Sequence, residues 1–283
     1  MCIRDRYYRK LFSGNYDIIF DNSPLISFFT RSLGFGCKTV YLEHSVWDNY
    51  NAVTKLLNRI TYKKVRQVVC CSEMVYRSNG CQGIVLNNAV NVSEVNEVAP
   101  SKDVNFDGYQ VVISVANVSK VKNHTMLVHA FGLMNTPSVK LVIVGDLRDN
   151  YDNVQEAINK SSKKHDIILY GPSDNVYGLL KLADVFCLTS NFEGMPISLL
   201  EAMSVGVVPV CTNVGGIPDV ITEKCGFVVE KGDVISFSKK IDFILENAKV
   251  RDVMSHESIK EIQDNYNLDD YCDNLMNLFK TIN

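Results

Sequence analysis

The sequence lacks an excess of either charge. Its 283 residues include 29 Lys and Arg against 32 Asp and Glu, giving a net charge of −3 at pH 7. No basic field is therefore available to hold a nucleic acid. Long hydrophobic runs are also missing, since none approaches the roughly 18 residues that suggest a membrane-spanning helix. The basic start, MCIRDRYYRK, is followed by no apolar stretch, so it does not have the pattern of a secretory signal.

The cysteines lack the spacing of a disulfide framework or a zinc site. There are nine, at positions 2, 37, 70, 71, 81, 187, 211, 225 and 272, and no C-x-x-C occurs among them. Several lie in apolar runs such as VFCLTS, which indicates reduced thiols packed in a core. His124 and His129 are five residues apart, not the four that pair histidines on one helix face. We expect no metal bound by the protein alone.

Short apolar runs alternate with helix-length amphipathic segments along most of the chain. The helical segment 233–245, for example, places Phe237 and Ile241 on one face. Val- and Ile-rich strands without polar alternation, separated by helices, are typical of parallel sheets covered on both faces. The sequence therefore predicts a doubly wound α/β fold. Its predicted strands are 17–20, 39–42, 67–71, 84–86, 111–115, 140–144, 167–170, 185–188, 207–211 and 227–229.

The rhythm breaks at 92–108, which is polar, contains Pro100 and has no apolar periodicity, so it looks like a linker. A self-sufficient α/β unit of typical domain size follows it. The shorter part before it has few strands and no opening strand with a glycine-rich turn. We therefore expect an incomplete N-terminal Rossmann-like domain at 1–105, a C-terminal one at 106–265 and a final helix at 266–283. The first six residues are expected to be non-native.

The most informative stretch is 184–219, DVFCLTSNFEGMPISLLEAMSVGVVPVCTNVGGIPD. It predicts a strand, the loop 191–196, a helix over 197–205, a second strand and a glycine-rich loop. Ligands of open α/β sheets bind at the carboxyl ends of strands. A helix N-terminus at that edge offers free N–H groups to a diphosphate. Gly194 and the Gly215-Gly216 pair would let the backbone approach a ligand closely.

Two carboxylates flank this turn, Glu193 and Glu201. A fully helical segment would separate them by about 12 Å at 1.5 Å per residue. That reach suits a ligand with a diphosphate at the helix tip and a polyhydroxylated ring on either side. A carboxylate that accepts from two vicinal hydroxyls makes charge-assisted hydrogen bonds. Glu201 lies among apolar residues, where an unpaired carboxylate would be costly, and this favours a ligand role.

The pattern E-G-M-P-x4-E-A-M-x2-G-x2-P-V, followed by N-V-G-G-I-P-D, resembles glycosyltransferase family 4, whose members are retaining sugar-nucleotide enzymes of the GT-B fold. The resemblance extends to SVANVSKVKNH, LVIVGD and ILYGPSDNV, and to VVCCSEMV and VLNNAVN upstream. It covers the chain from about residue 16 to its end. It implies two Rossmann-like domains, transfer of a hexose from a nucleoside-diphosphate sugar to an acceptor hydroxyl, and no cofactor, because the donor is a substrate.

The resemblance also implies a role for each matching residue. Glu201 would hydrogen-bond the ribose, and Glu193 would contact the donor sugar near its anomeric centre. Lys122 would neutralise the departing diphosphate, and His44 would face the transferred sugar from the N-terminal domain. The remaining expected donor-binding residues lie at the start of the helix, beside the base, and five positions before Lys122. They are, in that order, Gly194, Met195, Pro196 and Ile197, then Gly171 and Pro172, then Asn117.

The chain departs from the family pattern at two places. Asn117 stands where many members have a phosphate-binding arginine, so Lys122 and the helix terminus must provide more of the positive charge. The opening strand and glycine-rich loop of the N-terminal domain are also missing, which suggests an N-terminal truncation. No D-x-D occurs, which disfavours the metal-dependent chemistry of the other large glycosyltransferase fold.

Each candidate also has a structural interpretation. Lys122 could be a surface lysine, His44 next to Trp47 a packed core histidine, and Gly215-Gly216 a plain turn. Two other functions remain open: a sugar-nucleotide epimerase of the same architecture, and a protein that binds a nucleotide-sugar without transferring it. Product analysis and restoration of an N-terminal segment would distinguish them.

The expected partners are a nucleoside-diphosphate sugar, most often a UDP-sugar in this family, and a saccharide or lipid-linked saccharide acceptor. The resemblance suggests bacterial surface polysaccharide biosynthesis in the cytoplasm. A lipid-linked acceptor would favour peripheral membrane association, although no basic amphipathic helix is evident. The segment Leu268–Ile282 is amphipathic, and in this fold it would cross back onto the N-terminal domain.

Overall fold

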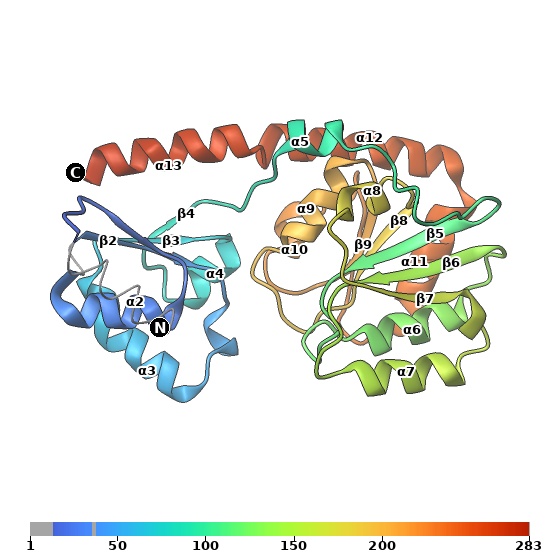
Figure 1. The fold of residues 1–283 in the computed structure, drawn as a ribbon, viewed down its shortest axis with the longest axis horizontal. Helices are drawn as coiled ribbons and strands as arrows, with labels where there is room; N and C mark the ends of the chain where they lie inside the picture. Colours follow the sequence, from blue (N-terminus) through green and yellow to red (C-terminus); the bar gives the residue numbers. More distant parts are fainter. Residues whose placement is uncertain (1–13, 36–37, 283) are drawn as a thin grey trace.

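The computed structural model describes residues 14–35 and 38–282, and it contains two separate parallel β-sheets with helices on both faces (Figure 1). One sheet is built from the N-terminal third of the chain and the other from the remainder. The expected α/β class with two parallel sheets is confirmed.

The N-terminal sheet has the strand order β1-β2-β3-β4. Its register pairs Ile19 with Thr39 and Val40 with Gln67. The strands are parallel and each new strand is added on the same side of the previous one. Its elements are β1 (Ile19–Asp21), α2 (Pro24–Thr30), η1 (Arg31–Phe35), β2 (Thr39–Glu43), η3 (Trp47–Asn49), α3 (Ala52–Thr61), η4 (Tyr62–Lys64), β3 (Gln67–Cys70), α4 (Glu73–Ser78) and β4 (Ile84–Val85).

The C-terminal sheet has the order β10-β9-β8-β5-β6-β7. After α5 (Val92–Glu97) the chain enters its centre, runs outward to β7, and returns to the other side of β5. The order therefore reverses between β5 and β8, which is where open α/β sheets bind ligands. The elements are β5 (Gln110–Val115), α6 (His124–Leu133), β6 (Val139–Val144), α7 (Tyr151–Lys160), η5 (Lys164–Asp166), β7 (Ile167–Gly171), α8 (Val176–Leu180), β8 (Val185–Leu188), α9 (Ile197–Ser204), β9 (Val208–Thr212), α10 (Ile217–Val220), β10 (Phe227–Val229) and α11 (Val234–Glu246).

Alternation along the central strands builds a core on each face of this sheet. Val112 on β5 packs with Leu127 of α6 and Phe237 of α11. Its neighbour Ile113 points to the opposite face, where it belongs to a cluster with Leu199 of α9. These strands have no polar side because both faces are covered, as the unalternating Val and Ile runs predicted.

The chain ends in two helices, α12 (Ala248–Asn265) and α13 (Leu268–Ile282). Figure 1 shows α13 running from the C-terminal sheet along the N-terminal one. There Leu278 and Phe279 pack against Val40 and Val69, and the ring of Phe279 meets Phe20 edge-on at 5.9 Å. The helix α13 therefore lies against the N-terminal sheet.

All the predicted strands form, with shifts of at most two residues. The largest shift is in β1, whose pairing with β2 begins at Ile19, two residues after the predicted start at Asp17. The expected linker is wrong in one respect, since it contains the helix α5. Asn91 caps that helix by accepting from the Glu94 N–H, and Val95 is fully buried.

The seven cysteines within the described ranges are free thiols. Cys2 and Cys37 lie outside those ranges. In the part of the chain that the structure describes, no helix combines the length and the apolar character needed to cross a bilayer.

Candidate active site

The site forms where the loops after β5 and β8 meet, at the point where the strand order reverses. Lys122 comes from the first loop and Glu193 from the second. The Lys122 Nζ lies 2.6 Å from Glu193 Oε1, and the Ser190 hydroxyl donates to the same oxygen at 2.5 Å. Only 8% of the Glu193 side chain is exposed, against 25% for Lys122. Two residues expected in the site are thus brought into direct contact across 71 positions of sequence.

The two loops are joined by further hydrogen bonds. The Thr189 hydroxyl donates to the carbonyl oxygens of Lys122 and Asn123, at 3.2 and 3.0 Å. The Asn191 N–H donates to the carbonyl of Val121 at 2.7 Å. These bonds fix the backbone of Lys122 relative to the strand that precedes Glu193. The sequence analysis missed Thr189 and Ser190, although polar residues at the carboxyl end of a buried strand are a signal that could have found them.

Glu201 lies in the middle of α9 and is partly buried. Its carboxylate accepts a hydrogen bond of 3.2 Å from the Tyr177 hydroxyl on α8. Burial raises the pKa of Glu201, and the negative charge of Glu94 raises it further, whereas the Tyr177 hydrogen bond lowers it. Tyr177 thus gives this carboxylate a partner within the protein, whereas the sequence analysis expected a ligand there. Tyr177 was also missed, because the contact joins two helices that follow different strands.

Gly194 lies against the N-terminal half of the molecule. A Cβ placed on it would be 2.0 Å from the carbonyl oxygen of His44 and 3.2 Å from the Cys71 thiol. The Gly194 carbonyl also accepts from the Gly216 N–H at 2.5 Å. Glycine is therefore required here by its close contact with the N-terminal half, and the Gly216 bond links the same residue to the C-terminal half. His44 and Gly194 meet through the backbone, although 150 positions separate them in the sequence.

The start of α9 completes this region. Pro196 precedes the helix, and its side chain makes no capping hydrogen bond, so the first N–H groups of α9 are left without a side-chain cap. Ile197 is half-exposed at this end. The carbonyl of Met195 accepts from the Asn88 amide at 2.8 Å, a second link between the halves. An uncapped helix start with a partial positive charge is suited to an anion.

The remaining expected residues lie at neighbouring strand ends. Asn117 follows β5, and its side-chain oxygen accepts from the Asp146 N–H at 3.1 Å. Gly171 ends β7 with a φ of +84° and accepts from the Gly145 N–H at 2.8 Å. The exposed Pro172 follows it. Asn117 therefore joins the ends of β5 and β6 here, a contact an arginine could not make in the same way.

The two histidines at this edge differ in their surroundings. His44 directly follows β2 and is exposed, while the neighbouring protein lowers its pKa by desolvation. His124 begins α6, is buried, and has its Nε2 3.3 Å from the Ser114 hydroxyl. Burial and the nearby Lys122 charge lower the pKa of His124 to about 4. Both imidazoles are therefore neutral at neutral pH. Within the described residues, no cluster of three or more His, Cys, Asp or Glu could hold a metal ion.

Comparison with known families gives this arrangement a context. Residues 96–261, more than half of the chain, match the family model described as glycosyl transferases group 1. The chain belongs to this family. The match includes Lys122, Glu193 and Glu201, whereas His44 lies before it.

Two curated relatives are similar to this glycosyl transferase group 1 protein over part of its length. An N-acetyl-alpha-D-glucosaminyl L-malate synthase of Bacillus anthracis is 28% identical over 159 residues, covering 56% of this chain and 42% of the relative. A UDP-Gal:alpha-D-GlcNAc-diphosphoundecaprenol alpha-1,3-galactosyltransferase of Escherichia coli is 31% identical over 147 residues, covering 50% and 37%. The matched segments thus span less than half the length of these relatives.

Solved structures share the fold of both halves. Anabaena HepE in complex with UDP-glucose superimposes with a TM-score of 0.87 at 16% identity, covering 94% of this chain and 79% of that one. The lipopolysaccharide outer core galactosyltransferase WaaB gives a TM-score of 0.71 at 17% identity, covering 98% and 79%. The expected GT-B fold is confirmed.

Proposed function

We propose that this protein transfers a hexose from a UDP-sugar to an acceptor hydroxyl with retention of the anomeric configuration. The observation that supports this most directly is the Lys122–Glu193 contact at the reversal point of the sheet, beside the uncapped start of α9. The contact places one cation and one carboxylate where a diphosphate and its attached sugar would meet. HepE, which shares the fold, is described in complex with UDP-glucose.

The chemistry follows from charge development. As the glycosidic bond to the diphosphate breaks, the sugar becomes oxocarbenium-like and the leaving group gains negative charge. Lys122 and the N–H groups at the start of α9 would stabilise that leaving group, an electrostatic form of catalysis. In the structure the Glu193 carboxylate neutralises the Lys122 ammonium. A bound diphosphate would therefore compete with Glu193 for that ammonium. Released from Lys122, the Glu193 carboxylate would be free to accept from hydroxyls of the donor sugar.

The remaining expected residues fit around this centre. Glu201 would accept from the ribose hydroxyls, sharing or replacing its bond to Tyr177, and Gly171 and Pro172 would border the base. His44, neutral and exposed, would face the sugar from the N-terminal half. Gly194, Met195, Pro196 and Ile197 would surround the diphosphate, with Asn117 near it. We also propose the domain division 1–105, 106–265 and 266–283.

Relatives indicate the class of acceptor. The Escherichia coli relative is named for a diphosphoundecaprenol acceptor, and one of Staphylococcus aureus for capsular polysaccharide biosynthesis. We therefore assign this protein to bacterial surface polysaccharide biosynthesis, acting on a lipid-linked saccharide from the cytoplasmic side of a membrane.

The test is calorimetric titration of UDP, GDP and ADP into the wild type and Glu201→Ala. We expect saturable UDP binding that Glu201→Ala weakens about 10- to 100-fold, the loss of hydrogen bonds to a charged group. The matched control is Glu223→Ala, an exposed carboxylate of the same half. Unchanged UDP affinity in Glu201→Ala would overturn the ribose assignment, and absence of nucleotide binding by the folded wild type would overturn the proposed function.

A further inference from the structure

The helix α3 buries uncharged polar side chains and exposes apolar ones. Asn58 and Thr61 are 1% and 2% exposed, whereas Val53, Leu56 and Ile60 are 66%, 57% and 61% exposed. A surface helix of a globular protein normally does the opposite, with its apolar stripe toward the core. Contiguous exposed apolar side chains of this kind mark an interaction surface.

This orientation is fixed by specific contacts on the buried side. The Arg31 guanidinium donates to Asn58 Oδ1 at 3.0 Å and lies over the rings of Tyr41 and Tyr62, 5.1 and 5.6 Å from their centroids. Rotating α3 to bury its apolar stripe would break the Arg31–Asn58 bond inside the protein, where an unpaired polar group is costly. The exposed stripe is therefore a property of the folded state.

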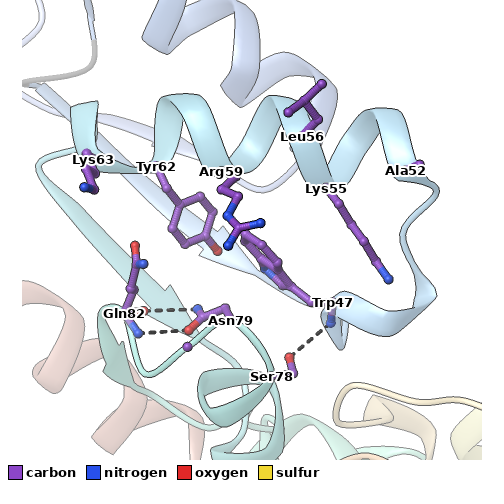
Figure 2. A pocket seen from close by; sticks show the side chains of 11 residues that line it. Trp47, Ala52, Lys55, Leu56, Arg59, Tyr62, Lys63, Ser78, Asn79 and Gln82 are labelled. Atoms are coloured by element: carbon purple, nitrogen blue, oxygen red, sulfur yellow. Dashed lines mark hydrogen bonds between the residues drawn. The ribbon is translucent and has the colours of Figure 1, made fainter.

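A basic stripe runs beside the apolar one. Lys55 and Arg59 lie one turn apart on one side of α3, and Lys63 follows four residues later in the 3-10 turn η4. They line a hollow of about 750 Å³ between α3 and the end of α4. Figure 2 shows Lys55 and Arg59 directed into this hollow, and Leu56 also lines it.

The charge of this region contrasts with that of the whole chain. Residues 49–72 contain no Asp or Glu, although the complete sequence has a net charge of −3. Lys55 reaches Asp48 at 3.7 Å, but among the described residues Arg59 and Lys63 form no ion pair. The surface formed by these two stripes is therefore both apolar and locally cationic.

The described part of the chain does not cover this surface. The helix α13 packs on the other face of the N-terminal sheet, against Val40 and Leu42, while Tyr41 between them points toward Tyr62 at the end of α3. Figure 1 shows α13 and α3 on opposite sides of that sheet. The hollow also begins close to the candidate active site, since Trp47 lines it and lies three residues after His44.

We propose that the outer face of α3 is a docking surface for a bilayer that contains anionic lipids. Val53, Leu56 and Ile60 enter the headgroup region, and Lys55, Arg59 and Lys63 contact lipid phosphates, the pattern of an interfacial helix. The inference corrects the expectation that no basic amphipathic helix is present. It rests on the proposed function, in which the acceptor is lipid-linked, and it gives the active site access to such an acceptor.

The experiment measures binding of the full 283-residue chain to vesicles of phosphatidylcholine with phosphatidylglycerol, and to vesicles of phosphatidylcholine alone, by co-sedimentation. Arg59→Gln/Lys63→Gln is expected to bind the anionic vesicles roughly 30-fold more weakly than the wild type, from the loss of two interfacial charges. Val53→Ser/Ile60→Ser is expected to weaken binding similarly. Trp47, the only tryptophan, provides a second readout by fluorescence from within the hollow.

Matched controls lie outside α3 and the hollow. Val253 and Ile235 are 63% and 61% exposed, so Val253→Ser/Ile235→Ser removes the same side chains at similar exposure. Lys102→Gln/Lys249→Gln removes two exposed charges elsewhere. Both controls should bind vesicles as the wild type does, and thermal unfolding should show that all four variants are folded.

No binding of the wild type to anionic vesicles would overturn the proposal, as would equal losses in the α3 variants and the controls. A change in oligomeric state in Val53→Ser/Ile60→Ser, with unchanged vesicle binding, would make the surface a protein interface and also overturn it. UDP titration without vesicles separates this failure from failure of the proposed function, because the α3 variants should bind UDP normally.

Discussion

At the scale of single residues, the site depends on charges that compensate one another before any substrate is present. Lys122 is held by Glu193 at 2.6 Å, and the Glu201 carboxylate is held by Tyr177 at 3.2 Å. Each carboxylate is therefore stabilised by a donor that a ligand could displace or share. Paired groups of this kind avoid the cost of a buried, isolated charge.

Replacing Lys122 with Ala should lower the transfer rate about 10²- to 10³-fold, because one preorganised cation at the departing diphosphate is lost. The turnover number should fall more than UDP affinity, since the charge develops mainly in the transition state. Steady-state kinetics with a radiolabelled UDP-sugar measures both. Lys120→Ala, an exposed lysine of the same loop, is the control. A Lys122→Ala enzyme with wild-type turnover would contradict the assignment.

UDP affinity should depend on the ionisation of Glu201. Burial and the Glu94 charge raise its pKa above the ordinary value of 4.5. A ribose hydroxyl donates best to the ionised carboxylate, so binding should weaken as the pH falls through this raised pKa. Glu94→Gln removes the charge and should move the weakening to lower pH, measured by UDP titration at several pH values.

The phosphates of UDP also titrate, but they do so identically for every variant. Comparing each variant with the wild type therefore cancels their contribution to the pH dependence of binding. Glu97→Gln is the control, because Glu97 is exposed on the same helix and does not contribute to the Glu201 shift. The midpoint is the pH at which UDP binding is half weakened. A midpoint that moves equally in both variants, or moves to higher pH in Glu94→Gln, would contradict the effect of the Glu94 charge on Glu201.

Sequence reasoning found the chemical groups of the site but few of their partners. Lys122 and Glu193 follow strand ends, and Glu201 lies in the helix that begins after Glu193, so motif and position indicate them. Their partners Ser190 and Tyr177 were missed, because side-chain contacts between different loops and helices depend on how those elements are placed in space. The same reason explains why the Gly194–His44 contact could not be predicted.

At the scale of elements, apolar patterning predicted the strands because fully covered parallel strands need continuous Val and Ile. It did not predict which side of α3 is exposed, since periodicity defines an apolar face without saying where that face points. Arg31 settles the orientation through Asn58. The helix α5 was missed because only one buried side chain, Val95, supports its six residues.

The helix α13 should stabilise the N-terminal sheet. Phe279→Ser should lower the free energy of unfolding by about 1–2 kcal/mol, the value for a partly buried aromatic side chain. Urea unfolding followed by the fluorescence of Trp47, which belongs to the N-terminal part, measures this effect there. Met276→Ser, at a position 53% exposed on the same helix, should leave the transition unchanged. Equal stability of Phe279→Ser and the wild type would contradict the packing role.

At the scale of the whole molecule, the two halves meet where the chemistry is proposed. Gly194 lies against His44, and Asn88 donates to Met195 at 2.8 Å. The N-terminal half therefore places its own groups against the loop that contains Glu193. In the proposed reaction both halves must hold one arrangement, whereas UDP is proposed to bind mainly to the C-terminal half, with Glu201 at its ribose.

Gly194→Ala tests this separation of roles. The added Cβ would lie 2.0 Å from the His44 carbonyl oxygen, a backbone atom, so the two segments must move apart. A displacement of about 1 Å can lower a rate about 10²-fold, so turnover should fall by that order while UDP affinity changes little. Gly132→Ala is the matched control, because its Cβ would approach only the Ser161 hydroxyl, at 3.2 Å. Unaltered turnover in Gly194→Ala would show that the close contact between the halves is not needed for the reaction.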